Sequence, residues 1–574
     1  MSDVQQRPEP AAEVERGQDE ARGAGAPRAA GRARRPERRR WWGFAIVCGW
    51  ILVLAGALLF GAALWVRRTF GPVSVDQLLT NLPGGGGEGA GGQGLVISGV
   101  VTGLVIPAAA VLVVALLAEK SRRALRAHGI PRPGWPRIGA RATAAVLALA
   151  VPAAGAVYAA DTIGVQEYAE AVIREQVTGT SIADFYVAPE LEGGSPGPGA
   201  ADGTAADAVP GTTDDGRRRN LIVIYLESME NAFADDEVFE RNMLEPVQRA
   251  TRGWDKIPRL RQYEGGGWTM SGIVATQCGI PLRSAAAVAD TTEMNKFGSA
   301  LDATASYMPG ATCLGDVLAD RGYRNVFMGG ADASFAGKGA FLASHGYDEV
   351  LDLREWRARG ETETRPDWGL SDRRLFELAK DEVARLHEAD QPFNLTMLSL
   401  DTHEQPHAYD YCPVDTEEEM TSITTCSMRQ VAGFIDALDN RGYLEDTTVV
   451  VMGDHLKAIG EMNSFWEEMR GMPDRSIFNR VWSPDGVRFA RADIDQFSMY
   501  PTLVELAGVE LPGHRAGIGV SALAPERKVA PGSILDLEPS AYDAVVRSRA
   551  SEFYRDIWRA DPEAVDAEAS ESAP

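Results

Sequence analysis

Polar side chains that can bind metal ions follow short apolar runs in this sequence, at the point where each run ends. Glu227 comes directly after "LIVIYL" and is followed by Ser228, and Asp454 and His455 come directly after "TTVVVMG". Carboxylates and a neutral imidazole together suit a divalent cation of the zinc or manganese type. Taken singly, each acid could instead be the N-cap of a following helix.

A third run, "FNLTMLSL", is followed by "DTHEQPH", which contains Asp401, His403 and His407. The chain has only seven histidines. Three of them, His403, His407 and His455, follow two of these apolar runs, which favours a common site. Grouped cysteines are absent from these stretches, which argues against a zinc site built from thiolates. The pattern therefore predicts a divalent cation held by carboxylates and imidazole.

The segment "GGGWTMSGIVATQCGIPL", residues 265–282, is typical of a glycine-rich loop that enters a helix. A hydroxyl at such an entrance faces the free N–H groups of the first helical turn, which favour anions. Thr269 stands at this point, and coordination to a cation would make its hydroxyl a nucleophile. The local alternative is an N-cap hydroxyl that accepts a hydrogen bond from the N–H of Ser271 or Gly272.

Other residues of this segment are weaker candidates for the nucleophile. Cys278, with Pro281 and Arg283, resembles the sulfatase signature C-x-P-x-R, but the spacing is wrong by one residue. Ser271 lies two residues beyond the helix entrance and points elsewhere on a helix. The segment has no G-x-S-x-G elbow of serine hydrolases, and the chain has no P-loop or convincing dinucleotide fingerprint.

Four short apolar runs, residues 221–226, 325–329, 393–400 and 447–453, are predicted to be buried strands. Helical stretches such as "RRLFELAKDEVARLHEA" lie between them. Strands that alternate with helices predict a layered α/β fold with a mostly parallel sheet. Ligands of such sheets bind beyond the carboxyl ends of the strands, so the fold would bring the acids and histidines to one edge.

Three long apolar stretches, residues 42–66, 95–118 and 142–160, predict about three transmembrane helices. Roughly 20 apolar residues are enough to cross the hydrocarbon core of a membrane. The third stretch is rich in alanine and contains Pro152, and its alternative is a buried helix of the soluble domain. A cleaved signal peptide is disfavoured, because the first stretch is long and lacks an obvious small-residue cleavage site.

Basic residues set the expected orientation of these spans. The arginine-rich tail 1–41 and the loop "EKSRRALRAHGIPRPGWPRIGAR" favour the cytoplasm. Three spans then place everything after residue 160 outside, in a multi-pass protein of the plasma membrane, although Arg67 and Arg68 weakly oppose this. The net charge is −24, and an acidic domain of this kind is a poor candidate for binding nucleic acid.

Composition divides the remainder of the chain. Residues 161–219 contain an amphipathic helix around "VQEYAEAVIREQV" and then a flexible linker rich in Gly, Pro, Ala and Asp. We expect a globular catalytic domain at 220–525 and a partly disordered extension at 526–574, and we expect the tail 1–41 to be disordered.

The five cysteines suit an extracytoplasmic domain, where disulfides are permitted. Cys48 lies in the first apolar stretch, and the other four could pair as Cys278 with Cys313 and Cys412 with Cys426. Four cysteines allow three connectivities, and buried free thiols are the alternative.

Four stretches of the chain resemble the membrane-bound phosphoglycerol transferases, which include the lipoteichoic acid synthases and belong to the alkaline-phosphatase and sulfatase superfamily. The stretches are "GWTMSGIVATQCGIPL", "CLGDVL", "SFAGKGAFLASHGY" and "YPTLVELAGV", and the resemblance covers roughly residues 219–525. It looks closest to the branch that transfers phosphoglycerol to periplasmic glucans. It implies a sulfatase-like domain whose mostly parallel sheet is flanked by helices.

The resemblance also implies a set of metal ligands. These would be Glu227, Thr269, Asp454 and His455, commonly around manganese, with zinc or magnesium as alternatives. Thr269 would be the nucleophile.

Substrate-binding residues follow from the same resemblance. His403 would lie near the substrate phosphate or glycerol and take part in catalysis, and His407 is a further candidate. Phe335 and Lys338 stand where lipoteichoic acid synthases carry a tryptophan and an arginine that bind the head group. A lysine can neutralise a phosphate, but it cannot bind one in bidentate fashion.

The implied reaction has two steps. Phosphatidylglycerol would present its phosphodiester at the membrane surface, metal-activated Thr269 would attack the phosphorus, and diacylglycerol would leave. The hydroxyl of a glycan or cell-envelope polymer would then attack the glycerophosphoryl-threonine. Rival interpretations are a phosphoethanolamine transferase, a phosphodiester or sulfate ester hydrolase of the same fold, and a catalytically dead membrane-anchored scaffold.

Overall fold

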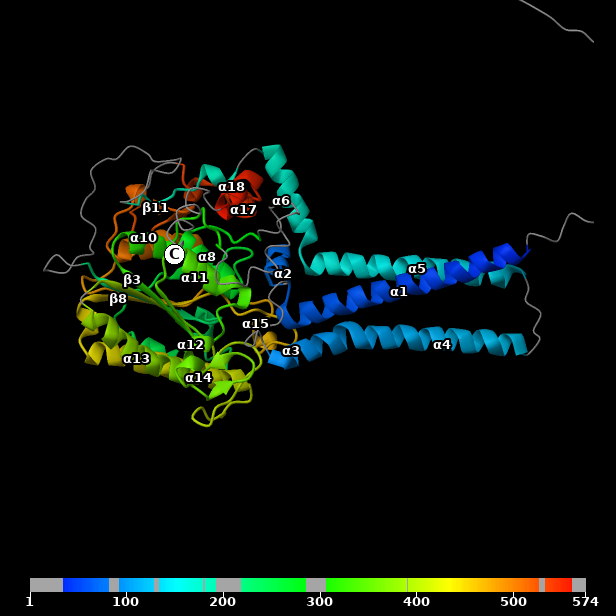
Figure 1. Ribbon diagram of the computed structural model, residues 1–574, viewed down its shortest axis with the longest axis horizontal. Coiled ribbons are helices and arrows are strands. Elements are labelled where there is room, and N and C mark those ends of the chain that lie inside the picture. Colours follow the sequence, from blue (N-terminus) through cyan, green and yellow to red (C-terminus); the bar gives the residue numbers. More distant parts are fainter. Residues whose placement is uncertain are drawn as a thin grey trace, which may run out of the picture.

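The computed structural model describes residues 35–81, 92–127, 134–178, 181–191, 218–284, 306–389, 391–525 and 532–559. In this part of the chain a bundle of long helices projects from one side of an α/β domain (Figure 1). The tail 1–34, most of the expected linker and the last residues from 560 lie outside the described residues.

A six-stranded sheet forms the centre of the α/β domain, in the order β4-β3-β7-β1-β8-β9. Neighbouring strands run parallel, except that β9 pairs antiparallel with β8. The predicted strands are all present, which confirms the mostly parallel sheet. The strands are β1 (Asn220–Leu226), β3 (Arg324–Gly329), β4 (Glu349–Leu351), β7 (Phe393–Leu398), β8 (Thr447–Gly453) and β9 (Asn479–Trp482).

Strand β1 shows why the predicted strands are almost entirely apolar. All seven of its residues are buried. Leu221, Val223 and Tyr225 belong to the core on one face of the sheet, and Ile222 and Ile224 belong to the core on the other. A parallel strand that is covered on both faces is expected to be continuously hydrophobic.

Helices cover both faces of the sheet (Figure 1). One core is closed by α8 (Thr269–Cys278), α10 (Leu314–Asp320), α11 (Lys338–Ser344), α16 (Gln496–Leu506), α17 (Pro539–Val546) and α18 (Ser551–Trp558). The other core is closed by α7 (Glu245–Ala250), α12 (Leu353–Ala358), α13 (Asp372–Glu388) and α14 (Glu419–Asn440). The C-terminal extension thus contributes to the first core, through Val545 and Tyr554.

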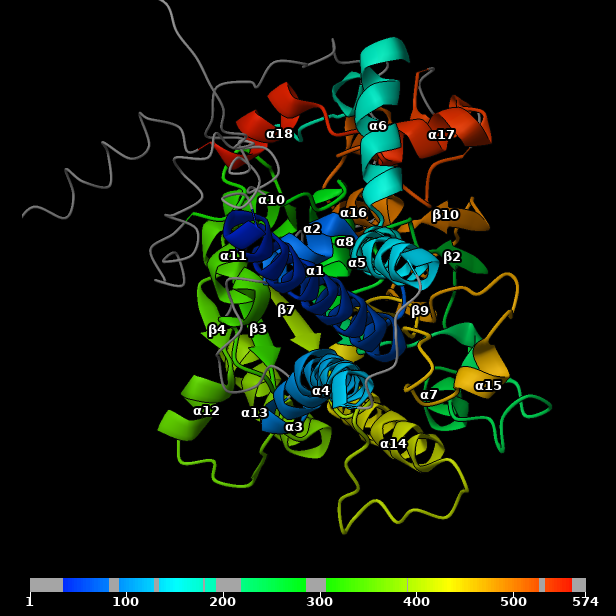
Figure 2. The same cartoon turned by 90° about the vertical axis from the view of Figure 1, so that its right-hand side faces the viewer.

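Two helices among the described residues are long and apolar enough to cross a membrane. They are Phe44–Phe70 within α1 (Arg35–Phe70), and Gly94–Ala124, which runs from α3 (Gly92–Gly99) through a π-helical turn into α4 (Ile106–Ala127). A third crossing is counted only if α5 (Gly134–Thr162) and α6 (Val165–Thr178), which are bent by 65°, form one span. Helix α1 packs against both α4 and α5 (Figure 2).

Arg67 and Arg68, at the end of α1, both have acidic partners. Arg67 pairs with Asp161 of α5, and Arg68 Nε lies 2.8 Å from Glu461 Oε2 of the α/β domain. These ion pairs give the two basic residues a local role at the junction between the helix bundle and the α/β domain.

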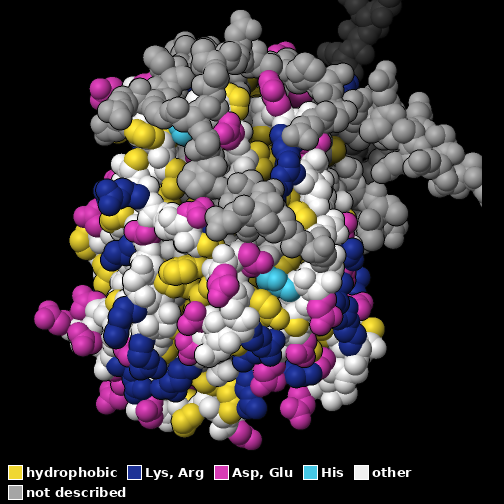
Figure 3. All heavy atoms as spheres, turned by 90° about the vertical axis from the view of Figure 1, so that its left-hand side faces the viewer, with side chains coloured by type: hydrophobic (Ala, Val, Ile, Leu, Met, Phe, Trp, Pro, Cys, Tyr) yellow, Lys and Arg dark blue, Asp and Glu magenta, His cyan; other side chains and the backbone are white. Residues whose placement is uncertain are grey.

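The two ends of the molecule have different surfaces. The face of the α/β domain that points away from the helix bundle carries acidic and basic side chains intermixed (Figure 3). Helix α4, by contrast, exposes Leu112, Val113 and Leu116. An exposed apolar surface of this kind suits contact with lipid, and the mixed charges suit water.

Two disulfides join segments of the α/β domain. Cys278, at the end of α8, is bonded to Cys313 at the start of α10, and Cys412 is bonded to Cys426 of α14. Cys48 forms no disulfide within the described chain. The structure thereby selects one of the three connectivities that the sequence leaves open, and it makes Cys278 a crosslink.

Candidate active site

The carboxyl ends of β1 and β8 lie side by side, because the last residues of the two strands pair in the register of the sheet. Glu227 and Asp454 are the next residues along the two strands, so both carboxylates leave the sheet at the same point. His455 follows Asp454, and Thr269 is the first residue of α8. Glu227, Thr269, Asp454 and His455 therefore lie at the carboxyl edge of the sheet, where the sequence predicts the site.

The side chains of Glu227, Asp454 and His455 converge so that one ligand atom of each lies within 4.8 Å of the others. His455 Nε2 lies 3.7 Å from Glu227 Oε1 and 3.5 Å from Asp454 Oδ2. The hydroxyl of Thr269 donates a hydrogen bond of 3.2 Å to Glu227 Oε2. The structure thus brings together the four residues that the sequence groups as metal ligands.

The donor atoms of this cluster fit a divalent cation. Asp454 Oδ2 is buried and has no hydrogen-bond partner among the described residues. His455 Nδ1 faces the carbonyl oxygen of Leu456 at 2.8 Å, which places the proton on Nδ1 and leaves the Nε2 lone pair free. Carboxylate oxygens, an imidazole nitrogen and a hydroxyl together form a donor set that suits zinc or manganese.

Burial makes this cluster costly when no cation is bound. Glu227, Asp454 and His455 are each at most 5% exposed. Burial raises the pKa of Asp454 to about 7, with His455 opposing the shift and Glu227 adding to it. Burial would also raise the pKa of Glu227, but His403 and His455 outweigh it and lower that pKa. A cation would take the place of the proton that Asp454 otherwise tends to hold.

Ser228 fixes the geometry of the two carboxylates. Its φ of 54° lies in the left-handed region, which turns the chain sharply after β1. Its N–H donates to Asp454 Oδ1 at 2.9 Å, and its hydroxyl donates to Glu227 Oε1 at 2.6 Å. The N–H of His455 also donates to Asp454 Oδ1, at 2.8 Å. These bonds orient Asp454 so that Oδ2 is the oxygen left for a ligand.

The first turn of α8 approaches the end of β8 so closely that only glycine fits at position 272. A Cβ atom on Gly272 would lie 2.2 Å from the carbonyl oxygen of Asp454. The same carbonyl accepts a hydrogen bond of 3.0 Å from Gln496 Nε2 of α16. Gly272 therefore sets the distance between Thr269 and the ligands that follow β8.

The hydroxyls near the start of α8 have different partners. Trp268 is the N-cap, and within the described chain no side chain caps this end, so Thr269 does not take the N-cap role. Ser271 and Thr276 donate to backbone carbonyls of their own segment, at 2.9 and 2.8 Å. Thr269 is thus the hydroxyl of this helix that faces the carboxylate cluster.

Glu227, Thr269 and His455 line a cavity of about 1090 Å³ that extends to the ends of the membrane helices. His403, Phe335 and Lys338, which the sequence assigns to substrate binding, also line this cavity. His407 does not join them among the described lining residues. Its ring packs against that of Tyr409 instead, with a centroid separation of 4.7 Å.

Trp368 is a cavity residue that the sequence interpretation misses. Its ring centroid lies 3.7 Å from that of His403 and 5.9 Å from that of Phe335. Its indole N–H is buried without a hydrogen-bond partner in the described structure. It lies between the short strands β5 (Thr364–Arg365) and β6 (Gly369–Leu370), where no periodic pattern distinguishes it from an ordinary loop residue.

Two buried lysines bring positive charge to the cavity. Burial lowers the pKa of Lys338, although Glu227 and Asp454 oppose the shift. Lys457 lies 2.6 Å from Glu404 Oε1, and both of these residues line the cavity. Lys457 could have been found from the sequence, because it stands in the same stretch after β8 as two of the ligands.

Asp401 does not join the cluster, although the sequence groups it with the ligands. Its carboxylate accepts hydrogen bonds from the N–H of Asp372 at 3.0 Å and from the hydroxyl of Tyr409 at 2.9 Å. Burial raises its pKa well above the ordinary value, and Asp372 adds to the shift. Asp401 therefore ties the loop after β7 to the start of α13.

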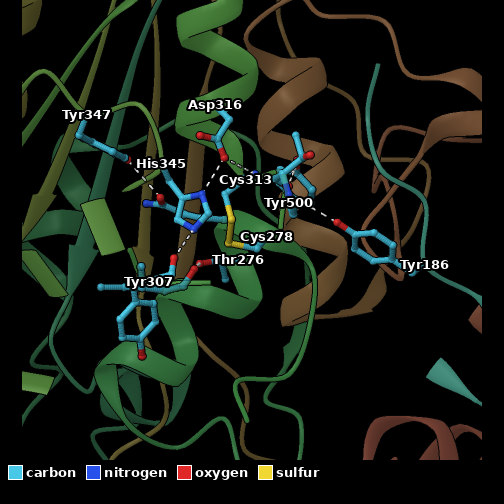
Figure 4. Close-up of a disulfide and its surroundings, with 12 residues drawn as sticks. Tyr186, Thr276, Cys278, Tyr307, Cys313, Asp316, His345, Tyr347 and Tyr500 are labelled. Atoms are coloured by element: carbon cyan, nitrogen blue, oxygen red, sulfur yellow. Dashed lines mark hydrogen bonds and ion pairs between the residues drawn. A yellow bond between two sulfur atoms is a disulfide. The ribbon is translucent and has the colours of Figure 1, made fainter. Parts of the chain in front are cut away.

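A second group of candidate ligands, Cys313, Asp316 and His345, lies beside a disulfide (Figure 4). Cys313 is bonded to Cys278 and offers no thiolate. Both ring nitrogens of His345 are engaged, Nδ1 at 2.7 Å from Asp316 Oδ2 and Nε2 at 3.0 Å from Tyr307 O. This group is a structural network that anchors the start of α10.

The α/β fold, with its mostly parallel sheet, is that of the alkaline-phosphatase and sulfatase superfamily. Residues 219–509 match the family model described as Sulfatase, which is half of the chain, and the chain belongs to this family.

The chain is also similar to curated and solved proteins. It is 37% identical over 251 residues to phosphoglycerol transferase I of Xanthomonas campestris pv. campestris, covering 42% of this chain and 34% of the relative. It is 31% identical over 292 residues to phosphoglycerol transferase I of Escherichia coli, covering 49% and 36%. The chain thus spans about a third of the length of these relatives.

Among solved structures, the integral membrane protein lipooligosaccharide phosphoethanolamine transferase A from Neisseria meningitidis is 14% identical to this chain. The superposition covers 80% of this chain and 84% of that one, with a TM-score of 0.42.

We expect Gly272→Ala to disable the site, because the added methyl group must push α8 away from Asp454. Overpacking of this kind costs about 1–3 kcal/mol of stability, and a displacement of about 1 Å can cost on the order of 100-fold in rate. Thermal unfolding measures the loss of stability, a turnover assay measures the loss of rate, and calorimetric titration with a divalent metal measures the metal affinity of the displaced site. Gly433→Ala in α14 is the matched control, since no described atom lies within 4 Å of a Cβ there. Equal metal affinity in Gly272→Ala and the wild type would contradict this prediction.

We expect a divalent cation to raise the melting temperature, because it relieves the repulsion of two carboxylates that are buried only in the folded state. A ligand at about 100 times its dissociation constant adds about 2.7 kcal/mol of stability. Scanning fluorimetry with manganese, zinc or EDTA measures the shift. Asp454→Asn should fold but lose the shift, and a wild-type melting curve that no metal changes would argue against a metal site.

Proposed function

We propose that this protein transfers a phosphoglycerol group from phosphatidylglycerol to a hydroxyl of a glycan or cell-envelope polymer and releases diacylglycerol. The observation that carries the proposal is the position of Thr269. Its hydroxyl donates to Glu227 beside Asp454 and His455, in a cavity that reaches the membrane helices. A nucleophile in this position can meet a phosphodiester at a membrane surface. The similarity to relatives named phosphoglycerol transferase I supports the choice of transferred group.

Thr269 carries the first step. Its Oγ1 attacks the phosphorus of the donor, the bond from phosphorus to the diacylglycerol oxygen breaks, and the glycerophosphoryl group stays on Thr269. The proton that leaves Thr269 ends on the diacylglycerol hydroxyl. A divalent cation held by Glu227, Asp454 and His455, which we propose to be manganese, would lower the pKa of the hydroxyl and offset phosphoryl charge. The free N–H groups at the start of α8 favour the same anion.

His403 serves the second step as a base. Burial lowers its pKa, although Glu227 opposes the shift, so the imidazole is neutral near pH 7. A neutral imidazole can accept the proton of the incoming acceptor hydroxyl, and the ring of Trp368 supports it from one side at 3.7 Å. The acceptor oxygen then displaces Thr269 Oγ1 from phosphorus, and the proton that His403 accepted passes to the threonine oxygen, which restores both residues.

The residues around the head group favour glycerol over ethanolamine. Phe335 and Trp368 offer aromatic surface to the glycerol carbons, and Lys338 offers positive charge to the phosphate. An ethanolamine head group carries its own ammonium group, which the charge on Lys338 would repel. A phosphoethanolamine transferase is therefore the second candidate.

The sulfatase-like part of the α/β domain, with limits near residues 220 and 525, is proposed to lie outside the cytoplasm on a multi-pass membrane anchor, together with the C-terminal helices α17 and α18 that pack on it. Its two disulfides support this placement, since disulfides persist in oxidising compartments. The donor is a lipid, and the apolar helices hold the site near that lipid.

Thr269→Ala should abolish diacylglycerol release while the protein still folds, because the change removes the attacking oxygen and leaves the core intact. Loss of a nucleophile typically costs on the order of 10⁴-fold or more in kcat. Thin-layer chromatography with labelled phosphatidylglycerol or labelled phosphatidylethanolamine measures how much of each lipid is consumed and how much diacylglycerol is released. Thr269→Ser, which keeps a hydroxyl, should retain part of the activity.

Two outcomes of this assay would reject parts of the proposal. Unchanged turnover by Thr269→Ala would show that Thr269 is not the nucleophile. If the wild type consumed only phosphatidylethanolamine, the donor would be that lipid and not phosphatidylglycerol.

A further inference from the structure

A buried carboxylate joins the juxtamembrane segment to the α/β domain. Asp76 lies in α2 (Val75–Asn81), the short helix that follows α1, and it is 2% exposed. Its two oxygens accept from both terminal nitrogens of Arg549, at 3.0 and 2.5 Å, and Arg283 Nη1 lies 3.4 Å from Oδ2. The N–H of Ser284 donates to Oδ1 at 3.2 Å. We call Asp76, Arg283 and Arg549 the ionic latch.

The ionic latch connects segments that are far apart in the sequence. Arg283 stands shortly after α8, the helix that begins with Thr269, and its Nη2 donates to the carbonyl oxygen of Val546 at 2.6 Å. Arg549 lies between α17 and α18, and its guanidinium carbon is 4.0 Å from the ring centroid of Tyr168 in α6. One carboxylate therefore ties α2 to the segment after α8, to the C-terminal helices and to α6.

Burial distinguishes the ionic latch from the other ion pairs at this junction. The side chains of Asp76 and Arg283 are 3% and 6% exposed, whereas those of Arg68 and Glu461 are 49% and 53% exposed. Exposed pairs contribute little, but loss of one partner from a buried pair leaves an unpaired charge. Burial would raise the pKa of Asp76, yet Arg283 and Arg549 outweigh it and hold that pKa below its ordinary value.

The helix that the ionic latch holds forms one wall of the cavity. Val73, Asp76 and Leu78 line the cavity on this side, and Thr269 lines it together with Glu227 and His455. Helix α2 also lies against the turn Phe335–Gly337, next to the proposed head-group site. A lipid that extends from the membrane helices to Thr269 would therefore lie along α2.

We propose that Asp76 is a positioning residue for the lipid donor. Through Arg283 and Arg549 it holds α2 as the wall against which the diacylglycerol portion rests while the phosphodiester meets Thr269. This inference rests on the function proposed above. Asp76 makes no contact with the reacting atoms and acts only through the placement of α2.

Full-length Asp76→Asn tests the inference with two substrates that require the same chemistry. One is phosphatidylglycerol in vesicles, and the other is the small soluble diester bis(4-nitrophenyl) phosphate. The variant should lose on the order of 100-fold in kcat/KM for the lipid. It should keep kcat/KM for the soluble diester, because Thr269 and the metal ligands are unchanged.

Two further variants make the result decisive. Arg549→Gln removes the bidentate partner but leaves Arg283 beside Asp76, so it should give the same split between substrates even if Asp76→Asn folds poorly. Glu461→Gln is the matched control, because it removes an exposed ion pair at the same junction. It should change neither activity.

The outcomes separate this inference from the proposed function. Equal losses on both substrates would show that the ionic latch only supports the fold, and unchanged lipid turnover would show that α2 does not position the donor. Either result overturns the inference and leaves the proposed function intact. A wild-type protein that cleaves the soluble diester but releases no diacylglycerol would reject the proposed function, and the inference with it.

Discussion

Two carboxylates and an imidazole are buried within 4.8 Å of one another at the edge of the sheet, and the rest of the site depends on this arrangement. Like charges so close and so far from water repel one another unless a cation or a proton lies between them. The sheet enforces the proximity, because β1 and β8 are neighbours whose last residues pair. The turn at Ser228 and the close approach at Gly272 then aim the ligands and bring α8 to them.

The reaction that Thr269 could carry out depends on the cavity that its hydroxyl faces. Glu227, Thr269 and His455 line a cavity that extends to the ends of the long apolar helices. The same cavity contains lysines that can neutralise a phosphate and a histidine that burial keeps neutral. A hydroxyl with an anion-favouring helix start behind it, in a cavity that reaches the long apolar helices, is suited to attack on a phosphodiester. The ionic latch adds a constraint on the side of the apolar helices, because Asp76 ties α2, which lines the same cavity, to Arg283 and Arg549 of the α/β domain.

The sequence predicts those features that depend on local patterns. Continuous apolar runs identify β1 and β8, and the rule that ligands bind beyond strand ends identifies Glu227, Asp454 and His455. The sequence pattern could not exclude Asp401 as a ligand, because its partner Asp372 belongs to α13 and not to the loop that contains Asp401. Trp368 and Asp76 were missed for the same reason, since their contacts join segments that no periodicity or spacing connects. The third membrane span is also not decided by hydropathy, because it depends on whether two helices bent by 65° act as one.

The most direct measurement of the central claim is peptide mass spectrometry of the full-length protein after incubation with phosphatidylglycerol and no acceptor. Without an acceptor the second step stops, so the covalent product of the first step should accumulate. We predict a glycerophosphoryl group on Thr269, within the stretch "GGGWTMSGIVATQ". Release of diacylglycerol with Thr269 unmodified, or with the group on another residue, would contradict the claim.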